Sequence, residues 1–145
     1  MAYAELHCIS NYSFLRGASH PEELVMQAAK LGYRAIAITD ECTMAGIVKA
    51  HVAAKEHDIK LIIGSEFQLD DDLLLVLLAP NRTGYGQICN LITLARRRAE
   101  KGMYRLALKD LEFATDQCIV IWFPGEPDTH HEVSASLLKE FFSDR

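Results

Sequence analysis

The sequence predicts an α/β protein in which helices alternate with mostly parallel strands. Two short apolar runs, 34–39 and 60–64, are continuous rather than alternating, as is typical of strands that are buried on both faces of a parallel sheet. Amphipathic stretches with helix start and stop signals separate such runs. The resulting order is strand, helix, strand, helix, strand pair, helix, strand, helix, which favours right-handed crossovers in one sheet.

The first two elements follow from the opening residues. A short extended stretch, 4–9, leads into a polar turn. The first helix should start at Ser19, which can cap it in a capping box with Glu22, while Pro21 suits the first turn. Gly32 is a typical helix stop.

The later elements are predicted from the same signals. They are a helix at 44–57, a strand pair at 67–69 and 73–78, a helix at 85–100, a helical turn at 108–111, a strand at 118–123 and a helix at 132–142. This gives five or six strands, too few to close a barrel of TIM size. We therefore expect an open sheet edge at the first or the last strand.

Composition and net charge limit the classes of function that the chain can have. The 145 residues fit one domain or part of one, half of them are apolar, and the net charge is −5, which argues against this chain alone holding a nucleic-acid backbone. We expect no secretory signal and no membrane span, because the longest apolar run, 73–79, is too short. The cysteines are scattered, without a C-x-x-C pair, and we expect reduced thiols in a cytoplasmic protein: Cys8, Cys42, Cys89 and Cys118.

Three polar residues should meet at one edge of the sheet. His7 lies on the first extended stretch, and Asp40 and Glu66 each follow an apolar run. The carboxyl ends of parallel strands share one rim, where α/β proteins place their ligands. His7 could hold a metal or a phosphate, or be a hydrogen-bonded histidine. Asp40 could be a metal ligand, or could cap a helix or hold a loop amide.

Three signature stretches resemble a known family. Residues 5–24, 35–42 and 62–67 are similar to the first three signatures of PHP (polymerase and histidinol phosphatase) domains. Their residues resemble those of the amino-terminal domain of bacterial C-family DNA polymerases, and most of all those of the error-prone DnaE-type branch. The resemblance continues through 85–102 and covers about residues 3–112, whereas the tail 113–145 is divergent.

The resemblance implies a distorted β/α barrel with metal ligands at the carboxyl ends of its strands. The chain would be a single PHP-like domain, 1–145, or its amino-terminal part, and so form only a partial barrel. His7, Asp40 and Glu66 match ligand positions. Two positions depart from the family pattern, because Ile9 and Glu41 stand where active members carry histidine. Losing an imidazole removes a nitrogen ligand, so we expect a degenerate site that binds zinc, manganese or magnesium weakly at best, although Glu41 could act as a substitute carboxylate.

The expected role follows from that resemblance. The parent protein would be a DNA-directed DNA polymerase, a nucleotidyltransferase active in translesion synthesis after DNA damage, and this domain would be a scaffold within it. DNA would be bound by the remainder of the polymerase chain. The alternatives are an active metal-dependent PHP phosphoesterase and a module that docks other replication or repair proteins.

Two further clusters have simple interpretations. Asp128, His130 and His131 look like metal ligands but lie in a proline-rich stretch, and a solvated loop is the better interpretation. Five cations gather near the end of a predicted helix, either as a nucleic-acid or partner surface or, more economically, as charges that complement the helix dipole: Arg96, Arg97, Arg98, Lys101 and Arg105.

Overall fold

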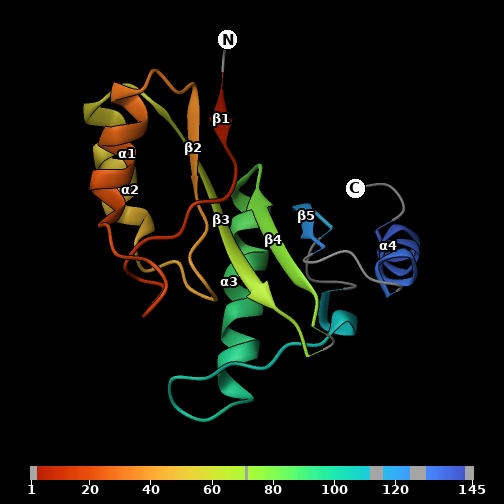
Figure 1. Cartoon of the computed structure of the whole chain (residues 1–145). Helices are drawn as coiled ribbons and strands as arrows, with labels where there is room; N and C mark the ends of the chain where they lie inside the picture. The colour runs from red at the N-terminus through yellow and green to blue at the C-terminus, as the bar shows by residue number, and fades with distance from the viewer. Residues whose placement is uncertain (1–2, 71, 112–115, 125–129, 143–145) are drawn as a thin grey trace.

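A five-stranded sheet organises the protein (Figure 1). The structure is a computed structural model that describes residues 3–70, 72–111, 116–124 and 130–142. The strands lie in the order β1 to β5: β1 (Ala4–Glu5), β2 (Ala35–Ile38), β3 (Lys60–Gln68), β4 (Leu74–Ala79) and β5 (Ile119–Phe123). The helices are α1 (Pro21–Lys30), α2 (Ile47–Glu56), α3 (Arg82–Arg97), a 3-10 turn (Leu108–Leu111) and α4 (His130–Phe141).

The strand directions confirm the α/β prediction. β1 pairs with β2 and β2 with β3 in parallel, whereas β4 is antiparallel to both β3 and β5. Four strands therefore run in one direction and only β4 is reversed. The reason is local, because the short connection at 69–73 allows only an antiparallel return, whereas a parallel partner needs a long crossover.

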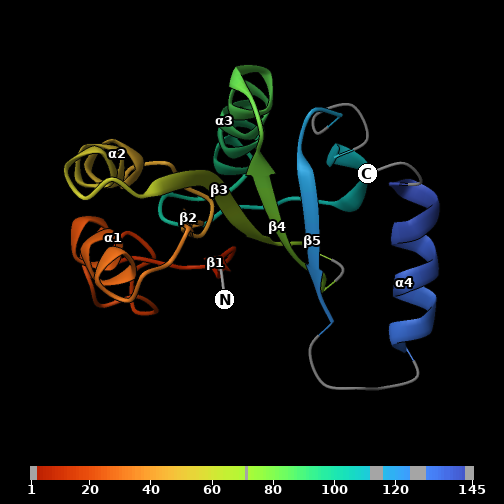
Figure 2. The ribbon, with the colours of Figure 1, turned by 90° about the horizontal axis from the view of Figure 1, so that it is seen from above.

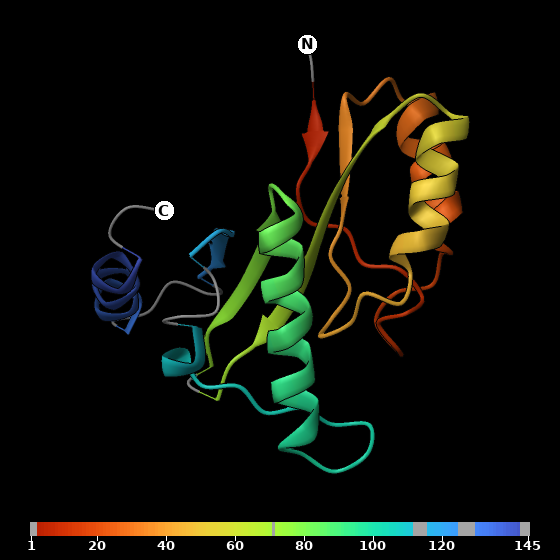
Figure 3. The ribbon, with the colours of Figure 1, turned by 180° about the vertical axis from the view of Figure 1, so that it is seen from behind.

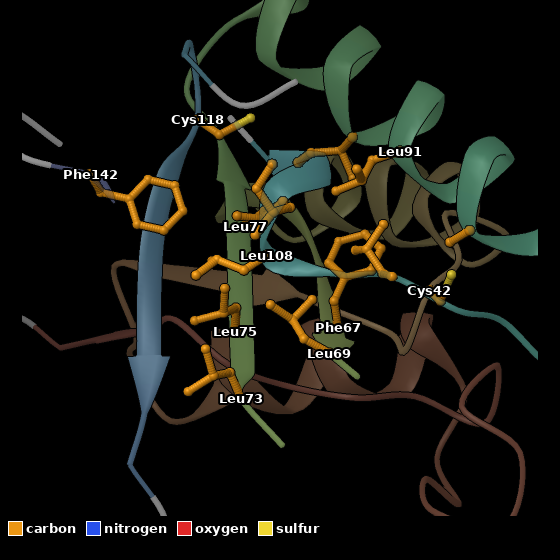
Figure 4. Close-up of a cluster of buried hydrophobic side chains, with 14 of the residues drawn as sticks. Cys42, Phe67, Leu69, Leu73, Leu75, Leu77, Leu91, Leu108, Cys118 and Phe142 are labelled. Atoms are coloured by element: carbon orange, nitrogen blue, oxygen red, sulfur yellow. The ribbon is translucent and has the colours of Figure 1, made fainter. Parts of the chain in front are cut away.

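The helices lie on the outer side of a curved sheet. Helices α1 and α2 pack side by side, and α3 packs against β3 and β4 (Figures 2 and 3). The largest apolar cluster lies beneath α3 (Figure 4), with Phe67, Leu75 and Leu77 from the strands and Leu91 from the helix. A smaller cluster occupies the opposite, inner face and centres on Val76. Strand β2 is thus buried on both faces, as the first continuous apolar run predicts, whereas residues 61–63 of the second run are only partly buried.

The sheet edges are β1 and β5, as expected. They approach each other at the carboxyl end, where the ring of His7 packs against the ring of Phe123 with centroids 4.6 Å apart. The described part of the chain is therefore a partial barrel whose rim is bridged at one end.

Several boundaries differ from the predictions. The first strand ends at Glu5 rather than at Ile9. Helix α1 is capped one residue later than predicted, because the Glu23 carboxylate accepts the backbone N–H of His20 (2.8 Å). Helix α3 begins at Arg82 because the side chain of Asn81 accepts the Gly84 N–H (2.9 Å).

Two other differences bear on packing. Helix α2 begins at Ile47, three residues after the predicted start at residue 44. The side chain of Val48 in its first turn is 73% exposed. Strand β3 continues past Gly64 to Gln68, so Glu66 lies within a strand and not at its end. Gly32 does end α1, with a left-handed φ of +74°.

Candidate functional site

The carboxyl rim brings two of the three predicted residues into contact. The Nε2 atom of His7 lies 2.6 Å from Oε2 of Glu66, although 59 residues separate them in the chain. Glu66 is fully buried on β3, and His7 follows β1 with its side chain half-buried. The parallel alignment of β1, β2 and β3 produces this meeting.

Arg16 is the central cation of the rim. Its Nη1 atom donates to Glu66 and, at 2.9 Å, to Glu41. The hydrogen bonds that Arg16 donates, first to Glu66 and then to Glu41, raise the pKa of its guanidinium above the ordinary value. Burial opposes ionisation of Glu66, but hydrogen bonds from His7 and Arg16 outweigh it and lower the pKa of this carboxyl. The charges form one network: imidazole, carboxylate, guanidinium, carboxylate.

Asp40 has a different task. Its carboxylate accepts the backbone N–H of Ser10 (2.6 Å), the Ser10 hydroxyl (2.7 Å) and the Ser13 hydroxyl (2.7 Å). Asp40 is 2% exposed, and its three hydrogen bonds hold the turn after β1 in place. Of the interpretations open for Asp40, the structure supports the loop-amide one. Gly17 completes this turn, since a Cβ there would lie 2.0 Å from the Ser10 carbonyl oxygen.

Glu41 is held from its other side. The Tyr104 hydroxyl donates to Oε1 of Glu41 (2.8 Å) and accepts the Gln68 N–H (2.9 Å). Burial and, less strongly, the Glu41 carboxylate raise the pKa of Tyr104. The guanidinium of Arg96 lies over the Tyr104 ring and donates to the carbonyl oxygen of Cys42 (3.2 Å). Both oxygens of Glu41 therefore have donors.

The sequence reasoning missed Arg16 and Tyr104 as members of this site. Arg16 lies inside the first signature stretch, but a guanidinium offers no lone pair to a metal ion, so a ligand pattern does not include it. Tyr104 lies in a loop without any motif. A search for a cation able to neutralise the two acids would have found Arg16 as a candidate.

Of the predicted cation cluster, Arg96 reaches the site through the ring of Tyr104. Arg98 pairs with Asp110 (2.6 Å) and Arg105 with Asp70 (3.4 Å), so these cations serve local contacts. Asp128 lies outside the described residues, and the side chains of His130 and His131 are not described either. Cys8, Cys42, Cys89 and Cys118 are present as thiols.

Protein donors occupy the carboxylates of the rim. Across the described ranges, no group of three or more histidine, cysteine, aspartate or glutamate side chains is arranged to hold an ion. The carboxylates of Glu41 and Glu66 both face the guanidinium of Arg16, and the Asp40 carboxylate is filled by three hydrogen bonds. Ile9 offers no ligand atom.

Within the ranges that the structure describes, no helix combines the length and the apolar character that crossing a bilayer requires.

Comparison with curated proteins gives long matches to polymerases. The chain is 60% identical over 128 residues to an error-prone DNA polymerase of Dechloromonas aromatica, covering 85% of this chain and 12% of that protein. It is 50% identical over 145 residues to an error-prone DNA polymerase of Saccharophagus degradans, covering 100% of this chain and 14% of that protein. The chain thus spans about an eighth of the length of these relatives.

Solved structures and a family model agree on the fold. An amidohydrolase of Chromobacterium violaceum aligns with a TM-score of 0.71 at 16% identity, over 98% of this chain and 74% of that one. A candidate metal-dependent phosphoesterase of Bifidobacterium adolescentis aligns with a TM-score of 0.52 at 29% identity, over 67% of this chain and 35% of that one. The family model of the PHP domain matches residues 5–135. The chain therefore belongs to the PHP domain family.

Proposed function

We propose that this chain is the amino-terminal PHP module of an error-prone DNA polymerase. The parent enzyme would be a cytoplasmic nucleotidyltransferase that carries out translesion synthesis during the repair of DNA damage. The long matches to proteins of that name support this assignment. The module itself would serve as a scaffold, and its rim would be a degenerate metal site with a structural role.

The guanidinium of Arg16 is the observation that carries the structural role. A permanently charged side chain lies between Glu66 and Glu41, where a hydrolytic centre of this kind would need ions to activate water and to bind phosphate oxygens. An arginine cannot lose its charge at physiological pH and cannot activate water as a Lewis acid. His7, Asp40 and Glu66 would therefore remain from a ligand set whose present task is to join the loops after β1 and β2 to strand β3.

DNA synthesis would lie in the remainder of the polymerase chain. The net charge of −5 gives this module little attraction for a phosphate backbone. We expect no primer extension by the isolated 145-residue chain, and extension past template lesions by a longer chain that includes it. Extension by the isolated chain would contradict the assignment.

Calorimetry tests the degenerate site directly. Manganese or zinc titrated into the chain should give no tight, stoichiometric binding, and EDTA should leave its unfolding transition unchanged. His7→Ala supplies the control, because weak adventitious binding would persist in that variant. Tight binding that disappears in His7→Ala would overturn the structural role.

A metal-dependent phosphoesterase is the second candidate. The alignment with a candidate phosphoesterase at 29% identity favours it, as does the contact of His7 with Glu66. Turnover of a generic phosphate ester with manganese, abolished in His7→Ala and in Glu66→Gln, would support this function. We expect no turnover above the buffer rate.

A further inference from the structure

Helix α2 carries two exposed apolar side chains on one face. Val48 is 73% exposed and Val52 is 51% exposed, and a spacing of four residues places them one above the other on the helix. Neither side chain belongs to an apolar cluster of the described structure. Valine also favours a helix less than alanine or leucine does. This face of α2 is therefore a candidate for contact with a ligand.

A groove of about 270 Å³ runs between α1 and α2 beside the two valines. The two helices lie side by side at the end of the sheet away from β5 and α4, as Figure 2 shows. The groove is therefore far from the site that α4 and β5 approach. Its wall consists of Glu22 from α1 and of Val48, Lys49, Val52, Ala53 and Glu56 from α2.

The charged groups of this groove are incompletely paired. The Nζ atom of Lys49 lies 3.8 Å from Oε1 of Glu22, which is long for an ion pair. Oε2 of Glu22 is buried and has no hydrogen-bond partner within the described structure. Glu56 forms no ion pair with any described cation. A buried carboxylate oxygen without a donor is costly, and two carboxylates against one ammonium favour a bound cation.

The two carboxylates lie at opposite ends of the groove. Pro21, the neighbour of Glu22, packs beside Gly46, where an added Cβ would lie 2.8 Å from the proline Cγ. Glu22 is therefore level with the start of α2. Glu56 is the last residue of that helix, which has 10 residues. At a rise of about 1.5 Å per residue, the two glutamates are about 15 Å apart along the helix.

We propose that this groove binds a linear aliphatic polyamine. One terminal ammonium group would donate to Glu22 and the other to Glu56, with the methylene chain against Val52 and Ala53. An extended aliphatic chain advances about 1.2 Å per bond. With a hydrogen bond of about 3 Å at each end, a chain as long as spermidine covers about 17 Å and one as long as putrescine about 12 Å. Only the longer ligand reaches both carboxylates.

Ligands of equal charge and different length test the site. Octamethylenediamine and putrescine both carry two ammonium groups, and octylamine keeps the long chain with only one. Each is titrated at low salt into the 145-residue chain, and NMR of the valine methyl groups reports on the groove. Octamethylenediamine and spermidine should shift the methyl resonances of Val48 and Val52. Both should bind about fivefold more tightly than putrescine or octylamine, the effect of one exposed ion pair.

Matched variants assign the binding to the groove. Glu22→Gln and Glu56→Gln should each weaken the binding of octamethylenediamine about two- to fivefold and remove its advantage over putrescine. Lys49→Gln should strengthen binding by a similar factor, because it removes the ammonium group that competes for Glu22. Glu100→Gln removes an exposed acid that follows α3 outside the groove, and it should leave the affinity unchanged.

The outcomes separate a built site from general attraction. Binding that depends on chain length and requires both Glu22 and Glu56 supports the proposal. Equal affinity for octamethylenediamine and putrescine would overturn it, as would an equal loss in Glu100→Gln, because cations would then be attracted to the acidic chain as a whole. Absence of binding, or binding that leaves the methyl groups of Val48 and Val52 unshifted, would overturn the proposal as well.

Discussion

Glu66 and Phe67 are neighbours on β3, both are fully buried, and they face opposite sides of the sheet. Phe67 packs in the large apolar cluster beneath α3, whereas Glu66 contacts an imidazole and a guanidinium at the rim. One face of β3 is stabilised by apolar packing, which has no preferred direction, and the other by ion pairs and hydrogen bonds between specific partners.

The two faces of β3 differ in how many alternative contacts each buried side chain has. An apolar side chain in a cluster touches many neighbours, and losing one of them removes a fraction of its contacts. At the rim, the guanidinium of Arg16 lies between the carboxylates of Glu66 and Glu41, so losing it leaves the buried Glu66 without one of its two charged partners. We expect the apolar face to set the total stability and the rim to set which arrangement of loops is adopted.

Phe67→Ala should have the largest effect. The exchange leaves a cavity in the cluster beneath α3, and such truncations cost about 3–5 kcal/mol. Urea unfolding would measure the loss, with Phe67→Leu as a control that fills most of the volume and should cost clearly less. A loss of under about 1 kcal/mol for Phe67→Ala would contradict the assignment of this face as the main core.

Arg16→Met should follow. Breaking a buried ion pair costs about 3–5 kcal/mol, but Arg16 is 41% exposed, and water will weaken the effect to about 2–3 kcal/mol. Adding Glu66→Gln removes the stranded charge and should restore part of the stability, because directly coupled residues are not additive. Fully additive losses in the double variant would show that the two residues do not interact.

Tyr104→Phe tests the second support of Glu41. It keeps the ring under Arg96 but removes the hydroxyl between Glu41 and Gln68, and we expect a loss of about 1–2 kcal/mol. Tyr33→Phe is a suitable control, because the Tyr33 ring packs edge-on against Tyr3 and is retained in that variant. Equal losses in both variants would show that removing a tyrosine hydroxyl costs the same at an unrelated position, so that the contacts of the Tyr104 hydroxyl with Glu41 and Gln68 add no stability of their own.

The pH dependence should be the smallest effect. The pKa of Glu66 is lowered in the folded chain, so its contribution is complete at neutral pH and is lost as the pH falls through the carboxyl range, below about pH 4. Urea unfolding as a function of pH should show wild type losing more stability on acidification than Glu66→Gln. Identical slopes would mean that Glu66 is not preferentially ionised in the folded state.

Local signals predicted much of the fold. The continuous apolar run ending in Thr39 identified β2 as a strand buried on both faces, and Gly32 ended α1 where expected. Cap positions were less certain, because neighbouring residues such as Ser19 and His20 compete for the same role and the three-dimensional contacts decide. The extension of β3 to Gln68 was missed, since Gly64 reads as a strand end although here it allows close approach to β4.

The site was predicted only in part. The contact between His7 and Glu66 follows from the order of parallel strands, which the sequence does indicate. The position of Arg16 does not follow from any periodicity, because 50 residues separate it from Glu66 and the turn that directs it inward depends on Asp40. Such an ion pair between distant residues depends on the folded structure and cannot be predicted from the presence of one arginine in the sequence.

The contact between His7 and Phe123 has a consequence for the time course of synthesis. The two rings that bridge the rim are separated by 116 positions in the sequence, so at about 5–20 residues per second the ribosome adds the second ring roughly 6–23 seconds after the first. Glu66 emerges about midway through that interval and can engage Arg16 as soon as it leaves the exit tunnel. In the nascent chain, the ion pair between Arg16 and Glu66 would therefore form first, and the contact of His7 with Phe123 would form later.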